Sequence, residues 1–484
     1  MKKRRQRNRI FAVFFCTVLA CPAWPARAES IGNVQSGYQV IHDTVQQPAA
    51  LEEMAASENS GGTQNWESGM GSIPKDYENR ITSFIPSVKG ACRTSFICQL
   101  SAGGYQTAIY ENGKIYVQDY DSSFQASRSC VLDLELPIWG GIFLGKEHNY
   151  VVCGKGYSSS EDKGGEVFRI IKYDKDFNRL GSKSLNGEET FTSVPFESGN
   201  VSIDENGEIL TVYTSRLRLD GHQSNISVQI RTENMELLST DGMGEFPSMH
   251  VSHSFRQIVS HDEGGAVYAD VSDGSPKRSV FVQGSGLKKS VMDIAGQDGN
   301  NLTNAELSGL AVTDTGYLIA GSYLKYDENN VFLAYLDKAT GYAEKTWLTD
   351  STAFQPKYVC YPRIAEAGAG RYAVMWSRFA SGSCLTDYVI VDGSGSIISG
   401  LKSVNADITD CEPIFADGKI VWLSIKNGKQ AFNQISDLSE GGSFECGAEI
   451  VQPENPWDGQ ADTSWYQEAE TEFSINTPQQ LAGL

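Results

Sequence analysis

The chain has 484 residues and a formal net charge of −20 at pH 7, from 60 acidic and 40 basic residues. A surface with this excess of acidic groups repels nucleic acid and anionic lipid at range, which argues against both as partners. The length allows two or three average domains or one large β domain.

The first residues have the organisation of an export signal. A basic stretch is followed by an apolar run from Ile10 to Ala20, and Ala26-Arg27-Ala28 matches the small-residue pattern of a cleavage site. The apolar run is roughly half of the ~20 residues that span a bilayer, which favours a cleaved signal peptide over 1–28 and argues against an uncleaved anchor. Removing its seven basic residues takes the formal charge from −20 to −27.

A second form of export stays open, because Val18-Leu19-Ala20-Cys21 resembles a loose lipobox. A lipid on Cys21 would anchor the protein to a membrane surface, and no later segment is apolar enough to insert. Both forms predict a protein that is secreted or held at the extracellular cell surface.

Eight cysteines follow the leader, and an even number in an exported chain indicates disulfides. The sequence does not fix their pairing, although short loops favour some partners over others. The favoured pairs are Cys92–Cys98, Cys130–Cys153, Cys360–Cys384 and Cys411–Cys446.

Composition divides the mature chain into three parts. Residues 29–90 are polar, with stretches such as SENSGGTQNWESGMGS, and are expected to form a flexible linker. Residues 91–448 hold short alternating apolar runs separated by Gly, Asp or Asn, which is the pattern of strands and turns. Residues 449–484 are expected to form an extended, loosely ordered stub.

Hairpins recur through the central part. The first is predicted around Glu111-Asn112-Gly113, because Asn-Gly suits a type I′ turn. Turn glycines fall near 113, 147, 207, 265, 316, 370 and 418. A second hairpin follows within several units, for example Val167–Tyr173 with Leu180–Leu185, and Tyr388–Val391 with Ile397–Leu401.

Two hairpins per unit make a four-stranded antiparallel sheet. The spacing of the units is typical of propeller blades, so we expect an all-β β-propeller of seven blades with four antiparallel strands each. The unit around Glu147-His148-Asn149 is the most degenerate. A two-sheet sandwich is the alternative, because counting strands does not show that the sheets close into a ring.

Several segments resemble secreted bacterial modular surface proteins with a β-propeller-like region. They are YDKDFNRLGSKSL, LDGHQSNISVQI, HVSHSFRQIV, GLAVTDTGYLIAGS and VFLAYLDK. The resemblance implies an extracellular module and no reaction. The ending TPQQLAGL is similar to the phrase that opens GLUG-type β-helical repeats, so we expect that the chain is truncated at Leu484 or that the stub is vestigial.

Two polar motifs are the candidate ligand site. They lie in loops that bound the third and fourth units, where polar side chains on a rigid scaffold commonly form binding sites. Their side chains would supply directional hydrogen bonds to a glycan or peptide, or would instead connect neighbouring blades. The predicted ligand-binding residues are Asp220, His222, Gln223, Asn225, His253 and Gln257.

Other chemistry has weaker support in the sequence. A zinc site from Asp220, His222, His250 and His253 is disfavoured, because alternate residues of a strand face opposite ways. Asp174-x-Asp176-x-Asn178 lacks the glycine and the final acid of a calcium loop, so a hairpin turn is predicted there, with loosely bound calcium elsewhere left open. No catalytic residues and no further cofactor are predicted.

The sequence therefore favours an exported binding module for an unknown extracellular glycan or protein ligand. One alternative is a carbohydrate-active hydrolase that uses a carboxylate pair, although no pair is singled out by its context. The other is a structural spacer that holds a further domain away from the cell.

Overall fold

A computed structural model gives the fold of the region beyond the leader. The residues that it describes are 63–71, 92–157, 164–240, 256–274, 277–284, 286–300, 302–325, 328–351, 358–380, 383–426, 429–436, 438 and 443–449. The predicted leader, most of the predicted linker and the predicted stub beyond 449 lie outside these residues.

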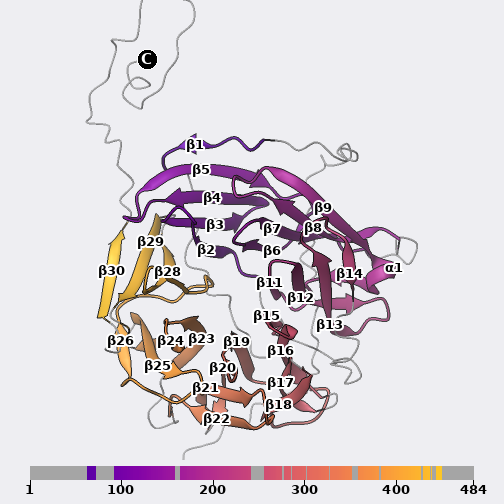
Figure 1. The fold of residues 1–484 in the computed structure, drawn as a ribbon. Coiled ribbons are helices and arrows are strands. Elements are labelled where there is room, and N and C mark those ends of the chain that lie inside the picture. The colour runs from indigo at the N-terminus through magenta and orange to yellow at the C-terminus, as the bar shows by residue number, and fades with distance from the viewer. Residues whose placement is uncertain are drawn as a thin grey trace, which may run out of the picture. The chain divides into compact units, whose positions relative to one another are not determined.

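The described residues form seven antiparallel sheets arranged in a ring, numbered here as blades 1 to 7 in chain order (Figure 1). Each blade is built from consecutive strands, and the innermost strands of neighbouring blades contact one another around the axis. The fold is therefore the predicted β-propeller with seven four-stranded blades. The separate sheets exclude the two-sheet sandwich.

Strand positions repeat from blade to blade. The innermost strands are β2 (Ser95–Gln99), β6 (Ile138–Leu144), β11 (Val201–Glu205), β15 (Ile258–Asp262), β19 (Ala305–Val312), β23 (Tyr358–Glu366) and β27 (Ile414–Ala416). The second strands are β3 (Tyr105–Glu111), β7 (Asn149–Gly154), β12 (Ile209–Arg218), β16 (Gly265–Asp273), β20 (Gly316–Lys325), β24 (Arg371–Ala380) and β28 (Lys419–Lys426).

The outer half of each blade completes the sheet. The third strands are β4 (Lys114–Tyr120), β8 (Glu166–Tyr173), β13 (Gln223–Arg231), β17 (Arg278–Gly284), β21 (Glu328–Asp337), β25 (Ser383–Asp392) and β29 (Lys429–Ser436). The outermost strands are β5 (Ala126–Asp133), β9 (Arg179–Asn186), β14 (Leu237–Ser239), β18 (Leu287–Asp293), β22 (Ala343–Trp347), β26 (Lys402–Val404) and β30 (Ser443–Glu449).

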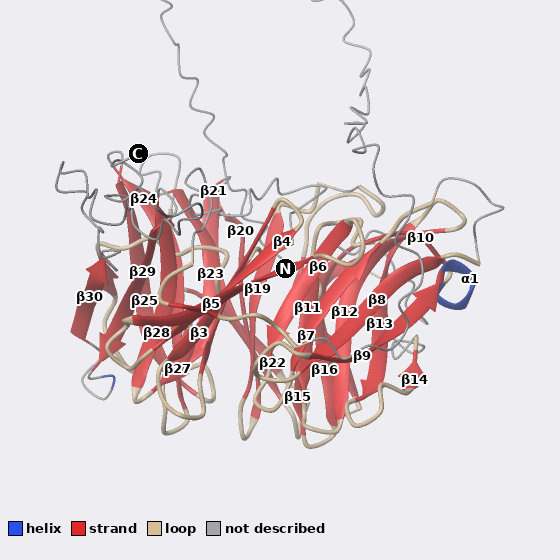
Figure 2. Ribbon diagram, turned by 90° about the horizontal axis from the view of Figure 1, so that it is seen from above, coloured by secondary structure: helices blue, strands red, loops and turns tan. Residues whose placement is uncertain are grey.

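Three short elements add to this pattern. β1 (Glu67–Ser68) pairs with β5, so part of the predicted linker lies against the outer edge of blade 1. β10 (Thr192–Pro195) pairs with β12 beyond the end of β11. α1 (Gly187–Thr190) lies at the rim (Figure 2). No helix of the described residues is long and apolar enough to cross a membrane.

The hydrophobic core lies between the blades. Each of seven buried clusters joins residues of two neighbouring blades, and together they cover all seven contacts of the ring. Middle strands are buried on both faces, as in β7, where every residue is buried. Outer strands alternate or face solvent, as in β22.

Side chains connect blades 7 and 1, and no strand of the described residues is shared between these two blades. Phe432 of β29 is fully buried and packs its ring 4.5 Å from that of Phe124 and 4.9 Å from that of Tyr120. The Asp410 carboxylate accepts a 2.6 Å hydrogen bond from the Thr94 backbone N–H. This seam depends on packing and hydrogen bonds between segments about 300 residues apart.

The predicted hairpins are largely confirmed, with two corrections. Asn112-Gly113 joins the second and third strands of blade 1, whereas the other turn glycines follow innermost strands. The first predicted hairpin is therefore one strand further out in its blade than the corresponding hairpins of the other blades. The strand predicted over Ile397–Leu401 is wrong: only Ile397 bridges to Val391, and β26 begins at Lys402. The unit predicted to be degenerate forms a complete blade 2.

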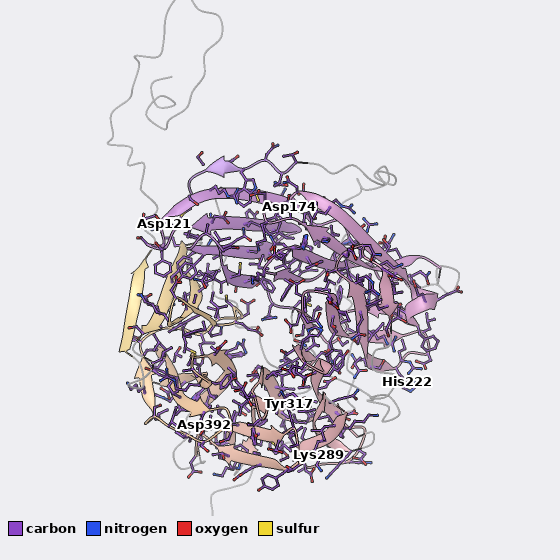
Figure 3. All side chains as sticks on the ribbon, in the orientation of Figure 1. Asp121, Asp174, His222, Lys289, Tyr317 and Asp392 are labelled. Carbon is purple, nitrogen blue, oxygen red and sulfur yellow. The ribbon has the colours of Figure 1, made fainter. Side chains whose placement is uncertain are left out.

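Aspartates close several of the outer hairpins, three of which are marked in Figure 3 by Asp121, Asp174 and Asp392. Asp174 Oδ1 accepts hydrogen bonds from the backbone N–H groups of Asp176 (2.9 Å) and Asn178 (2.8 Å). Asp121 and Asp392 make the same pair of bonds in their own turns. The DKDFN motif is therefore a hairpin turn, as predicted.

The cysteines whose side chains are described are free thiols, and the favoured pairs Cys92–Cys98 and Cys130–Cys153 are not formed in this structure. Burial raises the pKa of Cys92, Cys130 and Cys153 to about 12, so these thiols stay protonated at neutral pH. Cys411 is also free, and the side chains of its expected partner and of the remaining pair lie outside the described residues.

Candidate functional site

The predicted ligand-binding residues do not form one pocket. Asp220 and His222 occupy the exposed turn between β12 and β13, and His222 lies at the outer rim in Figure 3. His222 Nδ1 is 3.3 Å from Asp220 Oδ1, and Arg218 is 3.1 Å from Asp220 Oδ2. Partial burial opposes ionisation of Asp220, but the His222 backbone N–H and Arg218 outweigh it and lower the Asp220 pKa.

Two other predicted residues belong to a buried polar network between blades 3 and 4. Asn225 Nδ2 donates to Tyr213 Oη over 2.9 Å, and that hydroxyl donates to Asp270 Oδ2 over 2.8 Å. Gln257 Nε2 donates to the same carboxylate oxygen over 3.2 Å. Among the described residues the hydrophobic cluster at this contact is small, so polar bonds supply much of the connection between the two blades.

The two remaining predicted residues are Gln223 and His253. Gln223 Nε2 lies 3.5 Å from Glu197 Oε1, and His253 lies outside the described residues. Of the predicted set, Gln257 alone lines a pocket that the structure describes.

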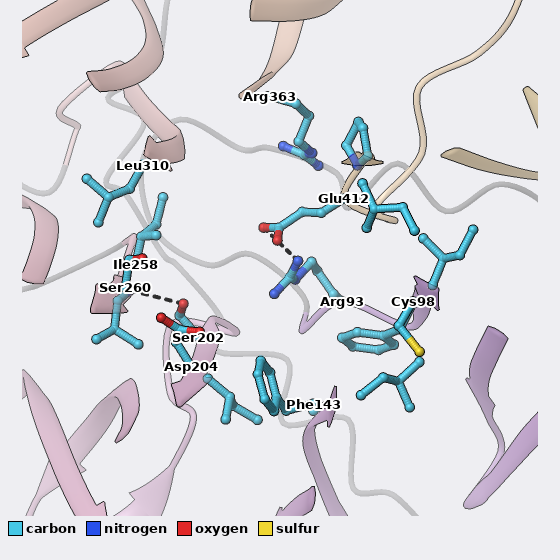
Figure 4. Close-up of a pocket in the computed structure, with 18 of the residues that line it drawn as sticks. Arg93, Cys98, Phe143, Ser202, Asp204, Ile258, Ser260, Leu310, Arg363 and Glu412 are labelled. Carbon is cyan, nitrogen blue, oxygen red and sulfur yellow. Dashed lines mark hydrogen bonds and ion pairs between the residues drawn. The ribbon is translucent and has the colours of Figure 1, made fainter. Parts of the chain in front are cut away.

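The main cavity lies on the axis of the ring and has a volume of about 470 Å³ (Figure 4). Residues of all seven innermost strands, or directly before them, line it. This volume is in the range of small-ligand sites, and a wall contributed by every blade makes the cavity a preformed feature of the fold.

The cavity wall combines polar atoms, which make up the larger share of its surface, with apolar side chains. Each blade contributes at least one aliphatic or aromatic side chain from its innermost strand. These side chains are Phe96, Ile97, Ile142, Phe143, Leu144, Val201, Ile203, Ile258, Val259, Leu310, Ile364, Ile414 and Phe415.

Charged side chains gather at one end of the cavity, around an adjoining hollow of about 40 Å³. The two cavities share Arg93, Arg363 and Glu412, and the hollow is also lined by Arg256 and Glu306. Each blade has four strands, so all innermost strands run in the same direction and begin at the same end of the ring. Residues that precede these strands in different blades therefore meet around the axis.

Arg93 and Glu412 form an ion pair across the seam between blades 1 and 7, with Nη1 and Oε1 2.6 Å apart (Figure 4). Burial disfavours both charges. The Glu412 carboxylate nevertheless raises the pKa of Arg93, and Arg93 together with Arg363 lowers the pKa of Glu412. Both groups are therefore charged at neutral pH.

Arg363 is buried, with 6% of its surface exposed, and points into the cavity (Figure 4). Its Nη1 donates to the Pro362 carbonyl over 3.2 Å, and its Nη2 donates to the Thr409 carbonyl over 3.3 Å. Its Nε has no hydrogen-bond partner among the described residues. A buried guanidinium N–H without a partner costs free energy, and this nitrogen is itself closed off from the cavity.

Arg256 lies at the same end of the cavity and is 8% exposed. Burial and the neighbouring positive charge of Arg363 lower its pKa, and Glu306 opposes this effect. Glu306 Oε2 is itself 3.3 Å from both the Tyr361 backbone nitrogen and Ser322 Oγ. The guanidinium groups of Arg256 and Arg363 thus repel each other, while the Asp410 carboxylate and the two glutamates lie among the arginines at this end.

A hydroxyl, an imidazole and a carboxylate are aligned between blades 3 and 4. Thr211 Oγ1 is 3.0 Å from His261 Nε2, and His261 Nδ1 is 3.1 Å from Asp204 Oδ2. This is the order of groups that activates a hydroxyl nucleophile. Thr211 is fully buried, however, so no substrate reaches its oxygen, and the geometry indicates a connection between blades.

Sequence reasoning missed the arginines and His261. The available signal was positional: Arg93, Arg256 and Glu412 each stand two residues before the first residue of an innermost strand. No group of three or more His, Cys, Asp or Glu side chains in the described residues is placed to hold a metal ion.

The sheets of the described residues define a seven-bladed β-propeller. No family model and no curated protein matches the sequence. The propeller domain of the Trilobed protease from Pyrococcus furiosus is similar over 75% of this chain and 98% of its own, with 12% identity and a TM-score of 0.39.

Two further solved structures have similarly low sequence identity to this chain. An uncharacterized protein from Listeria monocytogenes matches over 73% of this chain and 97% of its own, at 8% identity and a TM-score of 0.40. TolB from Acinetobacter baumannii matches over 72% of this chain and 80% of its own, at 11% identity and a TM-score of 0.32. Similarity this low carries no argument about function.

Proposed function

We propose that the protein is an exported binding module that holds its ligand in the axial cavity. The observation that carries the proposal is a cavity of about 470 Å³ whose wall combines apolar side chains from every blade with a group of buried charges. Small-ligand sites combine these two features, because apolar contact supplies free energy and a few polar groups supply orientation. The ligand is a small molecule, or the end of a larger glycan or protein.

Export is part of the proposal, and it is supported by the leader pattern over 1–28 and by the resemblance to secreted modular surface proteins. N-terminal sequencing of the protein recovered from outside the cytoplasm tests it. A mature chain that begins at Glu29 supports cleavage after Ala28, and a lipid-modified Cys21 supports the lipoprotein alternative. Material that retains Met1 contradicts both.

The predicted contacts Asp220 and His222 fit the proposal as rim contacts. The β12–β13 turn lies beyond the N-terminal end of β11, because β12 continues past Val201 to Arg218. This is the end of the ring at which the charged residues gather. A ligand longer than the cavity would therefore pass toward this turn.

The cavity gives less support to a hydrolase. The carboxylates that line the cavity are those of Asp204 and Glu412. A general acid needs a carboxyl group with a raised pKa. The Glu412 pKa is lowered and its carboxylate is paired with Arg93, while Asp204 is held by His261. Neither group is arranged to protonate a leaving group.

Glycan- and peptide-array binding by the purified full-length protein, with and without calcium, tests the proposed function. We expect a saturable, reproducible ligand. A folded sample that binds nothing on either array would contradict a binding module and support the spacer alternative.

A further inference from the structure

We propose that the axial cavity binds a protonated amine, and that the Asp204 carboxylate is the group that holds it. This inference rests on the proposed function and specifies the ligand class for the same site. An amine of this kind occurs at the N-terminus of a peptide and on an amino sugar. The inference predicts that the amine form of a ligand binds and that the matching N-acetylated form does not.

The first step is the position of the Asp204 carboxylate. Asp204 lies in β11, an innermost strand, and its side chain is 28% exposed and lines the cavity. One carboxylate oxygen, Oδ2, is 3.1 Å from His261 Nδ1, which can donate to it. The other oxygen, Oδ1, has no hydrogen-bond partner among the described residues and is open to solvent. The carboxylate is therefore held by one oxygen and can accept from a ligand with the other.

The second step is the set of acceptors beside this oxygen. Ser202 and Ser260 also line the cavity, on the same side as Asp204 (Figure 4). Ser202 Oγ accepts from the Val259 backbone N–H over 3.0 Å and has a second lone pair. The Ser260 hydroxyl has no hydrogen-bond partner among the described residues. A protonated amine has three N–H donors, which matches one oxygen from each of the three side chains.

The third step is the balance of charge around the cavity. The charged end holds as many carboxyl groups as guanidinium groups, namely Glu306, Asp410 and Glu412 beside Arg93, Arg256 and Arg363. Asp204 does not line the hollow at that end and is a further carboxylate of the cavity. Among the described residues its one ion-pair contact is with His261. A partly buried carboxylate is stabilised by a cation placed against it, so this part of the cavity favours a cationic ligand.

The charged groups next in the chain and in blade 2 do not supply this cation. Burial raises the pKa of Glu205, and the neighbouring Asp204 carboxylate adds to the effect, while Lys172 and Lys175 oppose it. The amino groups of both lysines already donate to backbone carbonyls, over 2.6 and 2.7 Å. The overall charge of −20 attracts cations at range, so the long-range field and the local carboxylate act in the same direction.

Isothermal titration with the full-length protein at pH 7 tests the inference, because an α-amino group is largely protonated at that pH. The probes are a tripeptide amide of apolar residues with a free N-terminus, glucosamine, and the N-acetylated form of each. The two amines distinguish a peptide end from an amino sugar as the source of the charge. We expect at least one amine to bind, and its N-acetylated form to bind at least about tenfold more weakly.

The variant Asp204→Asn removes the negative charge and keeps the size of the side chain and an acceptor for His261. We expect it to weaken binding of the amine by at least about tenfold and to leave the N-acetylated form unchanged. Asp204→Glu keeps the charge but moves it by one methylene group and should fall between the two. The matched control is Asp133→Asn, which removes an exposed carboxylate of blade 1 that pairs with Lys114 and should bind as the wild type does.

Equal binding of an amine and its N-acetylated form to the wild-type protein would overturn the inference, and this comparison stands even if a variant fails to fold. No binding of either amine, or a folded Asp204→Asn variant with unchanged amine affinity, would also overturn it. A neutral array ligand that loses affinity in the cavity-filling variant Ser260→Trp would then leave the proposed function standing.

Discussion

The contact between blades 7 and 1 depends on the packing of one side chain, Phe432. Phe432 is fully buried and contacts the rings of Tyr105, Tyr120 and Phe124, with centroids 4.5 to 5.7 Å apart. Phe432→Ala should lower the free energy of unfolding by about 5 kcal/mol, from lost burial, the cavity left behind and lost ring contacts. For a propeller of this size that lowers Tm by about 7 °C.

A matched variant separates closure of the ring from general loss of packing. Phe332 is equally buried but has its ring partner, Trp347, within its own blade 5. Phe332→Ala should cost about 4 kcal/mol. Hydrogen exchange measured by mass spectrometry should show faster exchange in β2 and β28 for Phe432→Ala only. The same exchange pattern in both variants would refute side-chain closure at this seam.

Three further predictions concern ionisation, buried polar contacts and thiols. The Glu135 carboxylate is partly buried, which opposes ionisation, but Arg179 (2.8 Å) and Arg169 (3.0 Å) outweigh this and lower its pKa. Its stabilising contribution is present above the ordinary pKa near 4.5 and is lost as the pH falls through the lowered pKa of the folded state. Glu135→Gln should therefore cost about 1–2 kcal/mol at pH 7 and less at pH 3 by denaturant titration. An equal cost at both pH values would contradict the ion pairs. Thr211→Val removes the partner of His261 Nε2 and should cost about 1–2 kcal/mol in thermal unfolding without changing ligand affinity, whereas loss of a hydrolytic activity would instead support a nucleophile. Alkylation in denaturant without reductant, followed by peptide mapping, should label Cys92, Cys98, Cys130, Cys153 and Cys411, and an unlabelled disulfide peptide would support the pairing expected from the sequence.

Much of the architecture could be predicted from local chemistry. Turn residues such as Asn206-Gly207 and Asp417-Gly418 mark hairpins directly, because only a few residue types tolerate their backbone angles. Which strand of the first blade is innermost could not be predicted in this way. Asn112-Gly113 is the strongest turn signal in the chain, yet it lies between the second and third strands, and which strand faces the axis depends on ring closure.

The site was harder to predict because its residues are far apart in the sequence. Arg93, Arg256 and Arg363 are single residues in three blades, and only ring closure brings them to the same cavity. The polar motif around Asn225 was conspicuous in the sequence, and the structure places it in the contact between blades 3 and 4. A local cluster of polar residues thus indicated an unusual inter-blade contact, while the charges of the cavity left no local pattern.

A plug in the cavity tests most directly whether the axis of the ring holds the ligand. Ser260 of β15 lines the cavity, and Ser260→Trp would fill it without altering any charged residue (Figure 4). Ser290→Trp, on the outermost strand of the same blade, is the control. We expect affinity for the array ligand to fall by at least about tenfold in Ser260→Trp and to stay at the wild-type value in Ser290→Trp. A folded Ser260→Trp protein that binds as tightly as the wild type would contradict an axial site.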